Sequence, residues 1–153
     1  MKILVLYHYP PAPGGLATQA DLLYKGLLEI GVDARPAHLQ SDLEKEWYYR
    51  SFKPDAVIGV GFWGDVPDLV LHPQRFGIRA VPWILADGYV ANYREVLDGL
   101  PLILVPSDWV RETFVRDGIR GDHAVTLPIG CDTDSFIPRS KDDPEVRAIR
   151  KTL

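Results

Sequence analysis

The fold is decided by residues 4–31, which read LVLYHYPPAPGGLATQADLLYKGLLEIG. The stretch begins as a buried strand, passes through a joint of three prolines and two glycines, and continues with apolar residues four and three positions apart. These apolar residues are Leu16, Ala20, Leu23, Leu27 and Ile30, and their spacing predicts one face of a helix that ends at Gly31. A strand joined to such a helix by a short loop begins a parallel β-α-β unit.

Short apolar runs rich in Val, Ile and Leu recur along the chain and predict buried parallel strands. They occupy residues 3–7, 56–60, 80–85, 102–105 and 124–127, with a sixth run at 32–37. Pro36 places that sixth run at an end or edge of the sheet. A second helix is expected after an N-cap at Ser107 or Asp108, closing at Gly118, with weaker helical segments at 41–52, 67–74 and 91–97. This alternation predicts the α/β class: a Rossmann-like, doubly wound parallel sheet in three layers, α/β/α.

Composition narrows the function classes. The 153 residues make about one ordinary domain, and 46% hydrophobic and 25% charged residues are typical of a globular chain. A formal net charge of −4, with scattered basic residues, predicts no binding to nucleic acid. The single Cys131 favours a reducing, cytoplasmic location. No apolar run reaches the roughly 18 residues of a membrane span, and peripheral membrane contact stays open.

The texture of the sequence changes after Ile137. Residues 138–153, PRSKDDPEVRAIRKTL, are charged and punctuated by proline, and a helix can start after Pro144. We therefore expect residues 1–138 to form the Rossmann-like domain and residues 139–153 to begin an interdomain linker and helix.

Gly14 and Gly15 lie in the first β-to-α turn, which in open α/β sheets is often a phosphate site. Glycine permits close backbone approach, and the helix opening near Leu16 presents free N–H groups and the positive end of its dipole. A phosphate is the expected guest. The dinucleotide-binding and P-loop fingerprints are both missing, and the alternative is that Pro-Gly-Gly only turns a strand into a helix.

Three further motifs follow in order: PDAVIGVG (54–61), LILVPSDWVRETFVRDGI (102–119) and AVTLPIGCDTDSFIP (124–138). Together with the Gly-Gly joint they resemble the amino-terminal half of GT-B glycosyltransferases, specifically glycosyltransferase family 4. The resemblance covers essentially the whole chain. It includes the pattern G-x-D-x-x-x-F-x-P, carried by Gly130, Asp132, Phe136 and Pro138.

The resemblance implies the acceptor-binding half of a retaining enzyme that moves a sugar from a nucleotide-sugar donor to an acceptor hydroxyl. It implies that Gly14 and Gly15 approach the donor diphosphate, that no cofactor or protein-bound metal takes part, and that the donor-binding C-terminal domain is absent. The isolated chain is then expected to be inactive. Many members carry a His after the fourth strand, whereas ILADGYV (84–90) has Asp87 there. Asp87 is the candidate catalytic residue, as a proton acceptor or sugar ligand, unless it only caps a turn.

Candidate acceptor-binding or sugar-binding residues surround the same strand ends. Aromatic faces beside a carboxylate suit sugar binding, and GFWGDVPD (61–68) supplies both, although its tryptophan is equally suited to packing under the loop. The segment DGYVANYR (87–94) offers polar contacts. His8 ends the first predicted strand, and Ser107 follows the fifth. The candidates are His8, Trp63, Asp65, Tyr89, Asn92, Arg94 and Ser107.

No metal site is predicted from the spacing of the four histidines and the single cysteine. Asp132, Thr133 and Asp134 spell a D-x-D, which we interpret as an Asx-type turn. A stand-alone Rossmann-like module that binds a nucleotide or sugar phosphate without chemistry remains the alternative function. A signalling receiver is disfavoured because YHYP (7–10) has no acidic cluster.

Overall fold

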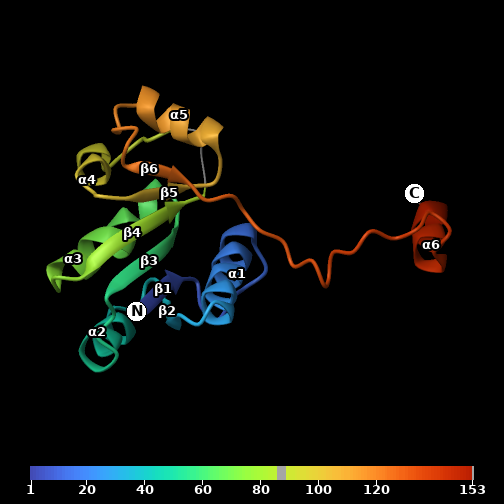
Figure 1. Ribbon diagram of the computed structural model, residues 1–153, viewed down its shortest axis with the longest axis horizontal. Helices are drawn as coiled ribbons and strands as arrows, with labels where there is room; N and C mark the ends of the chain where they lie inside the picture. Colours follow the sequence, from blue (N-terminus) through green and yellow to red (C-terminus); the bar gives the residue numbers. More distant parts are fainter. Residues whose placement is uncertain (86–88, 153) are drawn as a thin grey trace.

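The computed structural model describes residues 1–85 and 89–152 of the chain. Its centre is a parallel sheet whose described part has six strands in the order β2-β1-β3-β4-β5-β6. Figure 1 shows this order from β2 at the bottom to β6 at the top. The predicted α/β class is confirmed, and the three-layer arrangement is Rossmann-like.

The strands are β1 (Lys2–Tyr7), β2 (Asp33–His38), β3 (Ala56–Gly61), β4 (Arg79–Ile84), β5 (Ile103–Val105) and β6 (Ala124–Thr126). The helices are α1 (Gly15–Glu29), α2 (Asp42–Ser51), α3 (His72–Arg75), α4 (Arg94–Asp98), α5 (Asp108–Arg116) and α6 (Pro144–Thr152). A 3-10 turn, η1 (Trp63–Asp65), and a π-helical turn, η2 (Pro67–Leu71), precede α3.

The core divides between the two faces of the sheet, because successive strand residues point to opposite sides. Leu4 and Leu6 of β1 pack with residues of α2, η2, α4 and α5. Ile3, Val5 and Tyr7 face the other way, where Ala20 of α1 is buried against them. Four elements thus cover one face and α1 covers the other.

Most predicted elements are confirmed to within one or two residues. β2 is an edge strand, as Pro36 indicates, and it pairs only with β1 among the described strands. Gly31 ends α1 and Gly118 ends α5 with φ values of 80° and 98°, which glycine adopts at helix ends without strain.

One predicted helix begins later than expected. The sequence predicts a helix over 91–97, but α4 starts only at Arg94, because Tyr93 before it has φ 59° in the left-handed region. The apolar residues of this segment carry no signal for that backbone turn.

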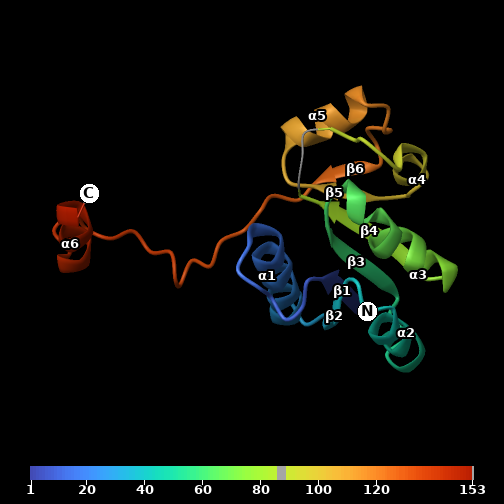
Figure 2. The same ribbon diagram turned by 180° about the vertical axis from the view of Figure 1, so that it is seen from behind.

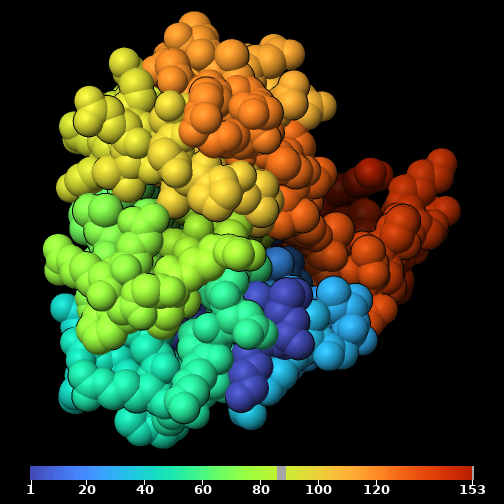
Figure 3. Space-filling model, turned by 60° about the vertical axis from the view of Figure 1, so that its left-hand side comes forward, coloured from blue at the N-terminus to red at the C-terminus, as the bar shows by residue number. Residues whose placement is uncertain are grey.

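The chain beyond β6 leaves the body of the domain. No residue of α6 is buried, and in Figure 3 the red C-terminal segment stands off from the rest of the surface. Within the described residues, no helix is long and apolar enough to cross a membrane.

Candidate functional site

The strand order places a topological switch point at the carboxyl ends of β1 and β3. From β1 the chain moves outward to β2 and then returns to the other side of β1 to form β3. Ligands of open α/β sheets bind outside the carboxyl ends of the strands at such a switch point. The residues that follow β1 and β3 are therefore the first candidates for a site.

The loop after β1 opens onto free space. At Gly14 and Gly15 an added Cβ would meet nothing within 4 Å, so the packing of the fold does not itself require glycine there. Gly14 is the N-cap of α1 and supplies no side-chain cap, while its carbonyl accepts the N–H of Thr18 at 3.0 Å. The N–H groups of the first turn have no partner within the helix, and they end in a region open to a ligand.

The segment after β3 turns tightly back on itself. The N–H of Phe62 donates to Asp65 Oδ2 at 3.1 Å, and the Asp65 N–H donates to the Phe62 carbonyl at 3.0 Å. Burial raises the pKa of Asp65, and the Phe62 N–H and the nearby His8 act in the opposite direction. Asp65 is thus a half-buried carboxyl group that interacts electrostatically with His8, just after the end of β1.

His8 has a neighbour that the sequence analysis did not single out. The His8 and His38 rings lie edge to face with centroids 5.8 Å apart, because β1 and β2 are parallel neighbours with Tyr7 beside His38. His38 Nδ1 accepts the N–H of Gln40 at 3.1 Å, so the neutral ring carries its proton on Nε2. His38 could be predicted as a neighbour of His8 only from the register of β1 with β2, which pairs Tyr7 with His38.

Trp63 and Tyr89 form an aromatic pair across the site. Their ring centroids are 6.2 Å apart, and the Phe62 ring lies 5.6 Å from Trp63. The Nε1 atom of Trp63 is buried and has no hydrogen-bond partner among the described residues, while Tyr89 is 51% exposed. The pair therefore combines a packed ring with an accessible one.

Asp87, the predicted catalytic residue, lies outside the described residues. Ser107 follows β5 and is the N-cap of α5, where its Oγ accepts the Val110 N–H at 3.2 Å. Its hydroxyl proton is still available to a second partner.

Asn92 and Arg94 are not brought to this edge. The Arg94 side chain passes 3.4 Å from the position of a Cβ on Gly118, beyond the C-terminal end of α5. That helix starts after the carboxyl end of β5, and its nine residues carry the chain about 13 Å back across the sheet. Asn92 and Arg94 line a separate shallow hollow formed by residues 91–96.

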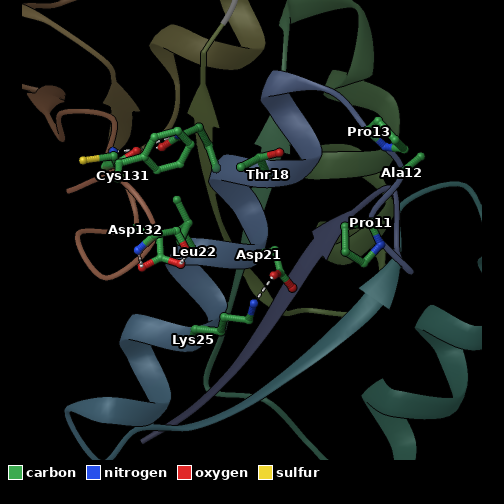
Figure 4. Close-up of a pocket in the computed structure, with 13 residues that line it drawn as sticks. Pro11, Ala12, Pro13, Thr18, Asp21, Leu22, Lys25, Cys131 and Asp132 are labelled. Atoms are coloured by element: carbon green, nitrogen blue, oxygen red, sulfur yellow. Dashed lines mark hydrogen bonds and ion pairs between the residues drawn. The ribbon is translucent and has the colours of Figure 1, made fainter. Parts of the chain in front are cut away.

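A hollow adjoins the Gly-Gly loop. It has a volume of about 600 Å³ and lies between α1, the prolines of the loop and residues 130–136 (Figure 4). Lys25 Nζ is 2.7 Å from Asp21 Oδ2, and the Tyr7 hydroxyl donates to Asp21 Oδ1 at 3.2 Å. The hollow separates α1 from segment 130–136. Asp21 and Lys25 on its wall are already paired with each other.

The D-x-D segment forms the predicted turn. Asp132 Oδ1 accepts the N–H groups of Asp134 and Ser135 at 3.0 and 3.2 Å, and Oδ2 accepts the Ser135 hydroxyl at 2.7 Å. These bonds lower the pKa of Asp132, led by the one from the Ser135 hydroxyl. Among the described residues, no three His, Cys, Asp or Glu side chains are placed together so as to hold a metal ion.

Comparison with known proteins finds likeness in structure rather than in sequence. No protein-family model matches the chain, and no curated protein matches it. Crystal structures of Anabaena Alr3699/HepE in complex with UDP and glucose, and with UDP-glucose, superpose with a TM-score of 0.63 at 13% identity. A third, in complex with UDP, gives 0.63 at 14%. The alignments cover 99% of this chain and 50% of HepE, so this chain spans half the length of those structures and shares their fold.

Proposed function

We propose that this chain is the acceptor-binding half of a GT-B glycosyltransferase resembling family 4, acting on a nucleotide-sugar donor with retention of configuration. The observation that carries the proposal is the open Gly14–Gly15 loop at the switch point between β1 and β3. The fold shared with HepE, which binds UDP-glucose, supports it. In this proposal residues 1–138 form the domain, residues 139–153 lead toward a donor-binding domain, and the reaction is cytoplasmic.

The donor diphosphate is assigned to the Gly14–Gly15 loop. The free N–H groups of the first turn of α1 and the helix dipole favour a negative group there. Because nothing occupies the space beside either glycine, a phosphate can approach the backbone without displacing a side chain. No cofactor and no protein-bound metal are needed, since positioning and charge stabilisation carry most of such a transfer.

The acceptor is assigned to the groups beyond β1, β3 and β5. Trp63 and Tyr89 offer aromatic faces for the C–H face of a sugar, and Tyr89 is the exposed ring of the pair. Asp65 and His8 supply polar contacts beside them, and Ser107 retains a free hydroxyl proton. Asp87 is proposed as the group that accepts or orients the acceptor hydroxyl proton.

Nuclear magnetic resonance of the ¹⁵N-labelled chain tests the donor site. UDP and UDP-glucose are expected to shift the amide signals of Gly14, Gly15 and Leu16 with roughly millimolar affinity, because in this proposal a donor-binding domain supplies the other half of the site. Uridine, which lacks the diphosphate, should leave these signals unchanged. If UDP-glucose leaves these amide signals unchanged, the assignment of the donor diphosphate to this loop is wrong.

Gly15→Ala provides a matched variant. Its Cβ meets nothing in the fold but occupies the open space beside the loop, so UDP should bind about tenfold more weakly, a loss of about 1.4 kcal/mol. Gly26→Ala also meets nothing, lies within α1, and should leave UDP binding unchanged. Equal weakening in both variants would mean that the loop is not the site.

The alternative, a stand-alone binding module, makes a different prediction. Such a module holds its nucleotide completely, so the chain alone would bind UDP at low micromolar concentration or below. Sugar transfer from UDP-glucose by the 153-residue chain alone would contradict the assignment to half of an enzyme.

A further inference from the structure

We propose that Gln19 is a positioning residue, a latch that holds segment 130–136 against α1 and so fixes the direction of the chain that leaves the domain. Two hydrogen bonds carry the inference. Gln19 Nε2 donates to the Gly130 carbonyl at 2.8 Å, and the Gly130 N–H donates to Gln19 Oε1 at 2.9 Å. The side-chain amide therefore pairs with both backbone groups of one residue 111 positions away.

This pairing is specific to an amide side chain of that length. A glutamate at position 19 keeps an acceptor for the Gly130 N–H but has no donor for the Gly130 carbonyl. A methionine keeps the length and the helix propensity and loses both bonds. The geometry thus separates the hydrogen bonds from the packing of the side chain.

Segment 130–136 is internally closed beyond the latch. Asp132 caps its own turn through the Asp134 and Ser135 N–H groups, and the Phe136 N–H donates to the Asp132 carbonyl at 2.8 Å. Because the turn is closed by its own hydrogen bonds, we expect it to move as one unit. The two bonds at Gly130 then fix the orientation of the whole segment relative to α1. The hollow on its inner side, seen in Figure 4, leaves room for the segment to move.

The position of the latch links two parts of the molecule. Gln19 lies about one helical turn after Gly15, the first residue of α1. In Figures 1 and 2, viewed from opposite sides, the chain leaving β6 passes the N-terminal end of α1, and Gln19 is the fifth residue of that helix. Resting on the proposed function, the latch holds segment 130–136 across a shared hollow from the prolines of the loop assigned to the donor diphosphate.

Cys131 offers a direct probe, because it is the single cysteine of the chain, is exposed, and adjoins Gly130. A nitroxide attached to Cys131 in the full chain reports the motion of segment 130–136 by electron paramagnetic resonance. The wild type should give one restrained component. Gln19→Met should add a fast component, with the released fraction raised about tenfold by the loss of two exposed hydrogen bonds.

Gln74→Met is the matched control, since Gln74 is an exposed glutamine of α3 remote from the latch. Hydrogen exchange of the Gly130 amide, measured without a label, should accelerate in Gln19→Met and stay unchanged in Gln74→Met. Gln19→Glu should be intermediate. If folded Gln19→Met, checked by circular dichroism, keeps both the wild-type line shape and the wild-type exchange rate, the latch is disproved.

Adding UDP to the labelled protein separates the latch from the proposed function. If both hold, UDP should shift the amide signals of Gly14 and Gly15 in the wild type and in Gln19→Met alike, while only Gln19→Met shows the fast component. If UDP has no effect on either protein while the two differ without ligand, the latch stands and the nucleotide assignment fails.

Discussion

At the scale of single residues, Gly61 allows the carboxyl group of Asp65 to reach the end of β3. A Cβ at Gly61 would collide with Asp65 Oδ2 and would lie 3.2 Å from Leu69 Cδ1, a tight contact. The missing side chain is therefore a condition for the turn that places Asp65 beside His8. The sequence alone does not predict this contact, because it shows only a glycine at the end of a strand.

Gly61→Ala should lower the free energy of unfolding by about 1 to 3 kcal/mol, the usual cost of overpacking. Urea denaturation measures the change. In Gly26→Ala the new methyl meets nothing within 4 Å inside α1, so stability should rise by about 0.5 to 1 kcal/mol. Equal behaviour of the two variants would show that Asp65 does not depend on Gly61.

At the scale of elements, α5 depends on its cap. The Ser107 side chain satisfies one of the N–H groups that a helix leaves free at its start, through the 3.2 Å bond to Val110. The cap also fixes where the chain turns from β5 into the helix.

Ser107→Ala should cost about 1 kcal/mol of stability, the typical value for a lost N-cap. Ser51→Ala serves as the control, because Ser51 Oγ only donates to the Trp47 carbonyl within its own helix. Chemical denaturation of both variants decides the matter, and a loss in Ser51→Ala as large as that in Ser107→Ala would contradict the assignment.

The elements were largely predictable because each depends on local signals. Apolar runs located the strands, Gly31 and Gly118 marked helix ends, and Ser107 marked a helix start. The late start of α4 was missed because the left-handed Tyr93 leaves no local trace in the sequence.

The seam between α2 and the η2–α3 helix contains a buried charged network that the sequence analysis did not find. Lys45 is fully buried, and its Nζ lies 2.9 Å from Asp42 Oδ1 and 2.8 Å from Asp68 Oδ1. His72 Nε2 lies 3.4 Å from the same Asp42 oxygen, and His72 Nδ1 is 3.3 Å from the Tyr49 hydroxyl. Burial, and then Lys45, lower the pKa of His72 below its usual 6.5.

This shift predicts acid sensitivity. The unfolded chain takes up a proton on His72 at a higher pH than the folded chain, so stability is complete above pH 6.5 and falls as the pH drops toward the lowered value. The hydrogen bond from Lys45 lowers the pKa of Asp42, so that contribution is lost only below its usual 3.8. The two effects therefore occupy separate pH windows.

His72→Gln should flatten the fall in stability between about pH 7 and pH 5, the window around the usual histidine pKa. Urea midpoints of the wild type and of His72→Gln at the two pH values measure it. A wild-type slope in His72→Gln would assign the acid sensitivity to another group.

At the scale of the whole molecule, the sequence predicted which strand ends carry the candidate site but not which residues meet there. The Gly-Gly loop, Trp63 and Asp65 follow from their places after β1 and β3. The pairing of Gln19 with Gly130 does not, because 111 residues separate the partners and no local pattern links them. Arg94 illustrates the converse, since its place in a polar segment suggested an edge position that the path of the chain does not give it.

The expected division of the chain near residue 138 has a thermodynamic test. Since no residue of α6 is buried, removing residues 139–153 should change the free energy of unfolding by less than about 0.5 kcal/mol. Removing residues 129–153 also deletes Gly130 and both bonds to Gln19, and should cost about 1 kcal/mol or more. Urea denaturation of the three lengths compares them directly. A large loss already in the shorter truncation would mean that α6 packs on the domain in solution, and the domain boundary would then lie elsewhere.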